Sequence, residues 1–249
     1  MTAPALVTLA HGSRDPRSAA TIASLTELVR CMRPDLRVEQ AYLELSEPGP
    51  LTVIDRLVAE GHDEVVVVPL LLTHAHHASV DVPAVVEAAR RRHPHVRVLA
   101  TDVLGIHKSF LGVLDLRLRA ALREARATEL DGLVLAAAGT SDQLANAHVA
   151  RVARAWGAHH KLPVLAAFAS SAPPAAGEAV RALRRDGKRH IAVGSLFLAL
   201  GFLPDRASEL ALEAGAVAVS DPLGAAPELA RVILARYAVG AVDLVPIPA

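Results

Sequence analysis

Short apolar runs alternate with amphipathic stretches along the first half of the chain. The apolar runs have the length of buried strands, and the stretches between them repeat apolar residues at helical spacing. Glycine and proline residues separate the two kinds of segment. This alternation predicts an α/β fold, with a parallel sheet covered by helices on both faces. The predicted strands cover 6–10, 36–43, 64–72 and 96–100, and the predicted helices 17–33, 51–61, 84–93 and 108–126.

The second half of the chain repeats the same order of segments. LVTLAHGSRD at 6–15 aligns with LVLAAAGTSD at 133–142, and VVVVPLLL at 65–72 aligns with IAVGSLFL at 191–198. A period this long indicates a duplicated domain rather than a short structural repeat. We therefore expect two similar, doubly wound domains with a cleft between them. The expected domains are residues 1–127 and 128–249.

The duplication provides an internal comparison for ionisable residues. Where the first copy has His11 the second has Ala138, and where the first has Glu44 the second has Ser170. The His-rich loop after the third strand has a counterpart without histidine at 199–206. Scaffold residues persist in both copies, so the fold alone does not explain the groups found in one copy. We infer one active site, built on the first half and facing the cleft.

These one-sided residues all follow strands. His11 comes after the first strand, Glu44 after the second, and His77, with His74 and His76, after the third. The carboxyl ends of parallel strands form one edge of a sheet, where ligands bind. Two imidazoles and a carboxylate suit Fe, Co, Ni or Zn, and the same groups can move protons near neutral pH. Both roles remain open.

The His-rich loop contains further candidates. Asp81 lies four residues after His77 and can orient its imidazole if a helix begins there. His74 and His76 can be accessory metal ligands or exposed loop residues. The loop is therefore expected to combine a ligand, its orienting carboxylate and two residues of undecided role.

Composition and charge exclude several classes of function. Lys and Arg total 26, equal to Asp and Glu, so we expect no nucleic-acid partner. No apolar run approaches the ~18 residues of a membrane span, and the start of the chain lacks a signal-peptide pattern, so we expect no membrane partner. Cys31 is the single cysteine, which favours a reducing, cytoplasmic setting. Ser13 and Arg14, before the first helix, are candidates for binding an anionic group.

Three motifs together resemble the CbiX/SirB family of class II tetrapyrrole chelatases. They are LAHGSRDP at 9–16, YLEL at 42–45 followed by a proline, and PLLL at 69–72 leading to a histidine four residues before DVP. The resemblance extends over nearly the whole chain, including its duplication. It implies two α/β domains around a cleft and insertion of a divalent metal into sirohydrochlorin without ATP. Iron then yields sirohaem, and cobalt leads to cobalamin.

The resemblance also implies roles for individual residues. His11, Glu44 and His77 match the family's catalytic motif positions, where the imidazoles take protons or hold the metal and the carboxylate balances charge or relays protons. Apolar residues at strand ends would cradle the flat ring, and polar residues would meet its carboxylates. The implied ring contacts are Leu71, Leu72, Phe197, Leu198, Phe202 and Leu203, and the implied polar contacts are Ser13, Arg14 and Arg206.

The expected function is therefore a sirohydrochlorin chelatase, a lyase that works as a monomer or homodimer. We expect no permanently bound cofactor, since Fe²⁺, Co²⁺ or Ni²⁺ would be a substrate, with Fe²⁺ for sirohaem the first expectation. Two other functions fit the same residues. One is a metal-dependent hydrolase or lyase, and the other is a non-enzymatic carrier of a tetrapyrrole or a metal.

Overall fold

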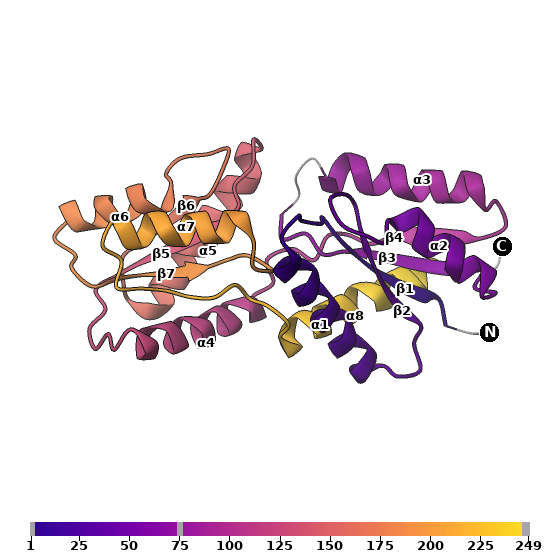
Figure 1. Ribbon diagram of the computed structural model, residues 1–249, viewed down its shortest axis with the longest axis horizontal. Helices are drawn as coiled ribbons and strands as arrows, with labels where there is room; N and C mark the ends of the chain where they lie inside the picture. Colours follow the sequence, from indigo (N-terminus) through magenta and orange to yellow (C-terminus); the bar gives the residue numbers. More distant parts are fainter. Residues whose placement is uncertain (1–2, 74–76, 246–249) are drawn as a thin grey trace. The chain divides into compact units, whose positions relative to one another are not determined.

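The computed structural model describes residues 3–73 and 77–245 and divides the chain into two compact units (Figure 1). Unit 1 contains the residues up to His107 together with those from Ala225 onward, and unit 2 is Lys108–Gly224. Strands alternate with helices in both units. The elements of unit 1 are β1 (Ala5–Ala10), α1 (Pro16–Met32), β2 (Val38–Tyr42), α2 (Pro50–Ala59), β3 (Glu64–Pro69), the π-helix η1 (His77–Asp81), α3 (Val82–Arg92), β4 (Arg97–Ala100) and α8 (Pro227–Asp243).

Unit 2 repeats this arrangement. Within the described residues its strands form a four-stranded sheet in the order β6-β5-β7-β8, and all of its strand pairs are parallel. The second sheet thus has the topology of the first, as the repeated sequence predicts. The elements of unit 2 are α4 (Ser109–Glu124), β5 (Gly132–Ala137), α5 (Gln143–His160), β6 (Val164–Phe168), α6 (Ala176–Arg185), β7 (Ile191–Ser195), α7 (Phe202–Glu213) and β8 (Ala218–Val219).

The sheet of unit 1 has helices on both faces, which confirms the predicted fold class. Its described strands are parallel, in the order β2-β1-β3-β4. Val7 and Leu9 of β1 point into the core formed with α2 and α3. Thr8 lies on the other face, where its hydroxyl bonds the Thr26 hydroxyl of α1 at 2.9 Å. Strands covered on both faces must be apolar at nearly every position, which explains the unbroken apolar runs.

One helix of each sequence repeat packs on the unit formed mainly by the other repeat. Helix α4 follows the fourth strand of the first repeat but packs against β7 and β8 of unit 2. Helix α8, at the end of the second repeat, packs against α1 and β3 of unit 1 (Figure 1). The repeats expected at 1–127 and 128–249 therefore describe the duplicated sequence, whereas the compact units exchange α4 and α8.

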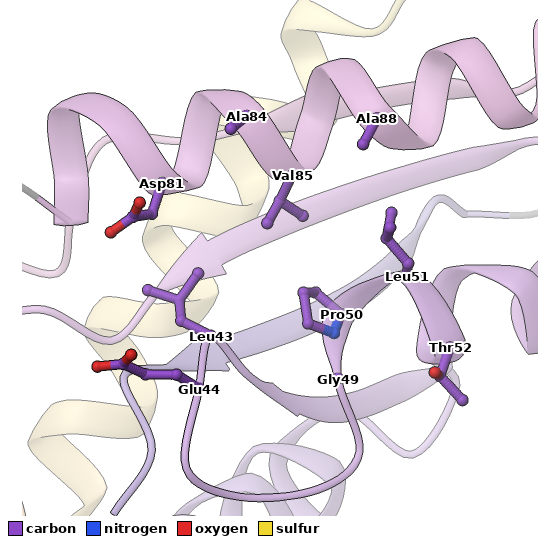
Figure 2. Close-up of a pocket in the computed structure, with 10 residues that line it drawn as sticks. All are labelled: Leu43, Glu44, Gly49, Pro50, Leu51, Thr52, Asp81, Ala84, Val85 and Ala88. Carbon is purple, nitrogen blue, oxygen red and sulfur yellow. The ribbon is translucent and has the colours of Figure 1, made fainter.

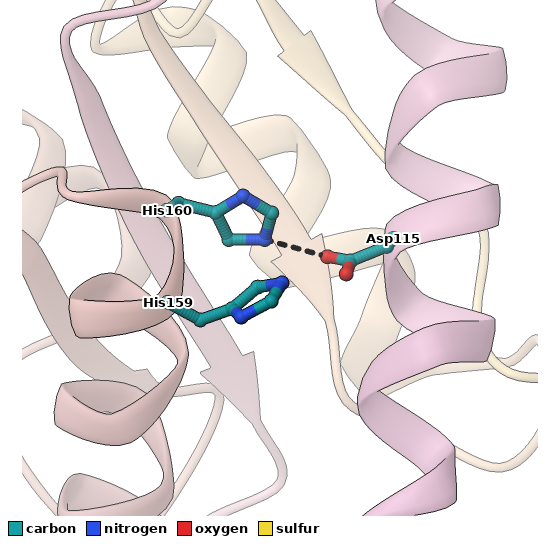
Figure 3. A group of neighbouring side chains, drawn as sticks. All are labelled: Asp115, His159 and His160. Carbon is teal, nitrogen blue, oxygen red and sulfur yellow. Dashed lines mark hydrogen bonds and ion pairs between the residues drawn. The ribbon is translucent and has the colours of Figure 1, made fainter.

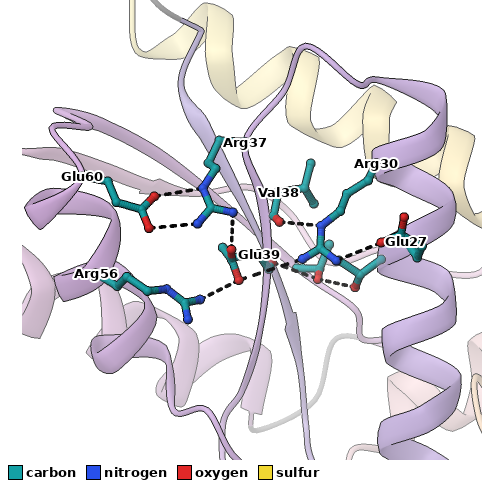
Figure 4. A network of polar contacts seen from close by, with 9 residues as sticks. Glu27, Arg30, Arg37, Val38, Glu39, Arg56 and Glu60 are labelled. Atoms are coloured by element: carbon teal, nitrogen blue, oxygen red, sulfur yellow. Dashed lines mark hydrogen bonds and ion pairs between the residues drawn. The ribbon is translucent and has the colours of Figure 1, made fainter.

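An ionic network covers the free edge of the first sheet at β2. Glu39 is only 12% exposed in its side chain and contacts Arg37, Arg56 at 2.6 Å and Arg30 at 3.9 Å. Arg37 also pairs with Glu60, the residue that follows the last residue of α2 (Figure 4). Charged side chains along an edge strand discourage pairing with strands of other molecules. We therefore interpret the network as protecting this edge against pairing with strands of other molecules.

Within residues 3–73 and 77–245, no helix is both long and apolar enough to span a bilayer.

Candidate functional site

The backbone places His11 beside Glu44. Past the ends of β1 and β2, the ladder continues for two more bonds: Leu43 N donates to Ala10 O at 2.9 Å, and Glu44 N donates to His11 O at 3.0 Å. The two residues therefore leave adjacent parallel strands at the same edge of the sheet. This is the edge at which α/β sheets bind ligands.

Gly12 allows the two loops to approach this closely. Its φ is +100°, and a Cβ at this position would lie 1.7 Å from the Glu44 carbonyl oxygen. Ser46 joins the same loops, because its hydroxyl accepts from Ser13 N at 3.0 Å and donates to Ser13 O at 2.8 Å. Sequence reasoning missed Ser46, since a contact between two loops leaves no periodic pattern. Together these contacts fix the backbone on both sides of His11.

The His11 imidazole is oriented by its two neighbours. Nδ1 lies 3.1 Å from the Gly12 carbonyl oxygen, and because a carbonyl only accepts, Nδ1 carries the proton of this bond. Nε2 lies 3.3 Å from Oε1 of Glu44. In the neutral imidazole, Nε2 then has the lone pair that can accept a proton or bind a metal, with a carboxylate beside it to stabilise the positive charge. The side chains are 38% and 52% exposed, so a dissolved reactant can reach both.

A groove that Glu44 helps to line runs between the start of α2 and α3. Its volume is about 530 Å³. The carboxylates of Glu44 and Asp81 lie at the same end of it, and the remaining walls are largely apolar (Figure 2). Sequence reasoning assigned Asp81 only to orienting His77, and the structure adds that it shares a groove with Glu44. The lining residues are Leu43, Glu44, Gly49, Pro50, Leu51, Thr52, Asp81, Ala84, Val85 and Ala88.

His77 is the first residue of η1, which leads directly into α3. A helix therefore begins at His77, as the orienting role of Asp81 requires, and β3 before it is the neighbour of β1. Single π-turns of this kind are frequent at functional sites. His74 and His76 lie outside the described residues.

The turn after β1 uses Ser13 and its neighbours in local bonds. The Ser13 hydroxyl accepts from Asp15 N at 3.1 Å, and the Asp15 carboxylate caps α1 by accepting from Arg17 N at 2.9 Å. Hydrogen bonds from the Arg17 side chain lower the pKa of the Asp15 carboxyl. Arg14 is exposed in the same turn. An anionic cap already occupies the start of α1, so Arg14 is the stronger of the two predicted anion-binding residues.

The predicted ring contacts fall into two groups. Leu72 is half-buried just beyond β3 and Leu198 is half-buried after β7, whereas Phe202 is 70% exposed at the start of α7. The predicted polar contact Arg206 is exposed one turn after Phe202. These side chains are available to a ligand on their respective units. Three other candidates pack in or against the core of their own unit, namely Leu71, Phe197 and Leu203.

The equivalent place in unit 2 has the same backbone without the ionisable groups. Ser170 N donates to Ala138 O at 2.9 Å, and the Ser170 hydroxyl donates to the same oxygen at 3.1 Å. Gly139 has a φ of +82°, and a Cβ there would lie 2.1 Å from the Ser170 carbonyl oxygen. The strand-end backbone is therefore built without His11 or Glu44, and their side chains are not required by the fold.

Comparison with known families agrees with this geometry. The family model described as CbiX matches residues 5–121 and 132–239, which are the two sequence repeats. The chain belongs to the CbiX family. The resemblance expected from the three motifs is thereby confirmed, and both copies of the duplication belong to the matched region.

Curated relatives of this CbiX-family chain include two chelatases from Priestia megaterium. A sirohydrochlorin cobaltochelatase is 28% identical over 206 residues, covering 80% of this chain and 66% of that protein. A sirohydrochlorin ferrochelatase is 24% identical over 210 residues, covering 82% of this chain and 77% of that protein. The chain thus spans about two thirds of the length of the cobaltochelatase that it matches.

Solved structures share the CbiX-family fold. SirB from Bacillus subtilis with Fe³⁺ has a TM-score of 0.80 at 24% identity, covering 97% of this chain and 96% of that one. The sirohydrochlorin chelatase SirB from Bacillus subtilis subspecies spizizenii in complex with cobalt has a TM-score of 0.77 at 20% identity, covering 97% of both chains. These likenesses support the two-domain α/β architecture.

Proposed function

We propose that this CbiX-family chain is a sirohydrochlorin chelatase, which inserts Fe²⁺ or Co²⁺ into the tetrapyrrole without ATP. The observation that carries the proposal is the His11–Glu44 pair, 3.3 Å apart and open to solvent at the strand ends. An imidazole beside a carboxylate can bind these metal ions and can accept protons. The names of the curated relatives supply the tetrapyrrole and the two metals.

Insertion replaces two pyrrole N–H protons by one divalent ion, so each turnover delivers one metal and removes two protons. Nε2 of His11 is the atom that accepts a proton or presents the metal, because Nδ1 is held by the Gly12 carbonyl. Glu44 stabilises the positive charge on either the imidazolium or the metal. We assign His77, at the start of η1, to the second imidazole of this set.

The groove beside Glu44 provides the route for protons to leave. Glu44, which is 3.3 Å from His11, lies at the same end of the groove as Asp81 (Figure 2), and carboxylates accept and release protons readily in contact with water. Arg14 and Arg206 would meet the carboxylates of the substrate, and Leu72 and Phe202 its ring. We further propose that the enzyme works in the cytoplasm, where the exposed Cys31 thiol stays reduced.

The proposal is tested by mixing anaerobic sirohydrochlorin with Fe²⁺, Co²⁺ or Ni²⁺ and following the change in absorption. The native chain should exceed the uncatalysed rate, and His11→Ala should lower the catalysed rate by roughly 10²-fold or more. His148→Ala, which removes an exposed imidazole on α5, should leave the rate unchanged. Equal rates for the native chain and His11→Ala would overturn the role of His11. Binding of sirohydrochlorin without insertion would instead identify a carrier.

A further inference from the structure

Three side chains of types that can ligate a metal lie together on unit 2, between α4 and α5. They are Asp115 from α4 and His159 and His160 from the last turn of α5, and one ligand atom from each lies within 4.8 Å of the others (Figure 3). His160 Nε2 is 2.8 Å from Asp115 Oδ1, and the two imidazole rings are 5.0 Å apart between centroids. The donor set is two imidazoles and one carboxylate.

The duplicated fold does not need this cluster. The register that aligns Gly12 with Gly139 places Met32 and Arg33 at the positions of His159 and His160. The register that aligns the DVLG and DPLG motifs places Leu234 at the position of Asp115. In unit 1 the equivalent helices α1 and α8 pack together without these three polar groups. Packing of the two helices therefore does not account for the cluster.

The surroundings of the cluster suit a cation. Nε1 of Trp156 donates to Oδ1 of Asp115 at 2.8 Å, which holds the carboxylate in place as groups behind a metal ligand do. Both histidines lie at the carboxyl end of α5, where the partial negative charge of the helix favours positive ions. His160 is half-buried and His159 is exposed, so one ligand is fixed and the other can adjust.

We propose that Asp115, His159 and His160 form a binding site for a divalent transition-metal ion such as Co²⁺, Ni²⁺, Fe²⁺ or Zn²⁺. Neighbouring ligands of an ion at ~2.1 Å stand about 3 Å apart, close to the 2.8 Å between His160 Nε2 and Asp115 Oδ1. The ion takes the place of the proton that Nε2 donates to the carboxylate, and that proton moves to Nδ1 through solvent. His159 turns inward to supply the third ligand, and water fills the remaining positions.

This site would be additional to the metal that is a substrate, and it does not depend on the proposed chelatase activity. Its three ligands belong to α4 and α5 of unit 2, whereas His11 and Glu44 follow strands of unit 1. Because both donor sets are two imidazoles with a carboxylate, the new site would take the same ions. A measurement must therefore distinguish the two sites by location.

Trp156 provides such a measurement, because it is the only tryptophan of the chain and its ring lies 5.6 Å from the His160 ring. Titration with Co²⁺ alone, without tetrapyrrole, should quench its fluorescence in a saturable way, since Co²⁺ quenches nearby fluorophores. His159→Ala should weaken the apparent affinity by about tenfold or more, and His160→Ala should do the same. Two control variants should show the same Co²⁺ quenching as the native chain. They are His11→Ala, in unit 1, and His148→Ala, at an exposed position on α5.

Equilibrium dialysis with Co²⁺ supplies a second readout. His159→Ala should bind one ion fewer than the native chain while its tryptophan emission without metal is unchanged, which shows an intact α4–α5 packing. The proposal is overturned if His159→Ala and His160→Ala quench and bind as the native chain does. It is equally overturned if His11→Ala abolishes the quenching, because the ion seen by Trp156 would then belong to the other site.

Discussion

Gly12 determines how closely His11 can approach Glu44. A side chain at this position would be strained by the positive φ and would collide with the Glu44 carbonyl oxygen. The same two conditions hold at Gly139 in unit 2, which has no ionisable pair. The glycine thus serves the turn in both units, and the chemistry is added by the neighbouring residues in one.

We predict that Gly12→Ala lowers the free energy of unfolding by about 2–4 kcal/mol, because the methyl group would collide with backbone. Gly61→Ala is the matched control, since its φ is +93° but nothing lies within 4 Å of the added Cβ. It should cost only about 1 kcal/mol, from the backbone conformation alone. Urea denaturation followed by circular dichroism measures both. Equal costs would show that the contact with Glu44 contributes nothing.

Glu44→Gln should reduce the chelation rate by about tenfold or more, because the amide keeps the size of the side chain but loses its negative charge. Glu47→Gln, three residues along the same loop, is the control. Glu47 accepts from Gly49 N at 2.8 Å and should leave the rate unchanged, since an amide oxygen can still accept. A Glu44→Gln chain with native rates for every metal would exclude the carboxylate from the reaction.

A double change tests whether the site is separable from the fold. His11→Ala with Glu44→Ser copies the side chains of Ala138 and Ser170, which the equivalent backbone of unit 2 carries with the same strand-end bonds. The urea midpoint should therefore stay close to that of the native chain, while chelation falls at least as far as in His11→Ala. A marked loss of stability would mean that the pair has a structural role.

At the scale of single elements, the edge strand β2 carries an ionic network around one nearly buried carboxylate, that of Glu39. Glu39 is nearly buried among three guanidinium groups, whereas the Arg91–Glu87 pair on α3 is 3.4 Å apart and mostly exposed. Removing one partner of a buried group leaves the others uncompensated, but an exposed pair is largely screened by solvent. The two sites should therefore respond differently to the same substitution.

Glu39→Gln should destabilise the protein by about 1–2 kcal/mol, and Glu87→Gln by less than ~0.5 kcal/mol. Thermal or urea denaturation of both variants at one salt concentration measures the difference. If the two costs were equal, the network around β2 would contribute no more than an ordinary surface ion pair.

The elements themselves were largely predictable from the sequence. Strands buried on both faces are apolar throughout, so β1 and β3 were recognisable, as was the placement of His11 at a strand end. The strand predicted at 64–72 was too long, because the apolar run continues after β3 has ended at Pro69. The start of η1 at His77 was not recognisable. Pro83 marks the first turn of α3, and no side-chain cap marks the start of α3. The 3.3 Å distance between His11 and Glu44 depends on the register of β1 and β2, which only the folded sheet defines.

At the scale of the whole chain, the exchange of α4 and α8 was not predictable. Both helices are amphipathic, and amphipathicity reveals which face is buried but not which sheet buries it. The sequence repeat therefore indicated a division at residues 127 and 128, whereas the helices pack across it. The unit that carries His11 and Glu44 is completed by residues from the far end of the chain.

Gly240 of α8 tests this dependence. A Cβ there would lie 2.8 Å from both Val66 Cγ1 of β3 and Thr101 Cγ2, so Gly240→Ala should lower the free energy of unfolding by about 1–3 kcal/mol. It should also lower the chelation rate, because it disturbs the unit that carries His11 and Glu44. Gly112→Ala on α4, where nothing lies within 4 Å, should be neutral or stabilising by up to ~1 kcal/mol. Urea midpoints and initial rates measure both. A neutral Gly240→Ala would show that α8 can lift from β3 without consequence.

The position of α8 also bears on the order in which the protein is made. Unit 2 is one continuous stretch, Lys108–Gly224, and can close as soon as it leaves the ribosome. The first sheet, although synthesised earlier, lacks the helix that covers β3 beside α1 until α8, which follows unit 2 in the chain, has been synthesised. Unit 1, whose strands are translated before unit 2, therefore finishes folding after it.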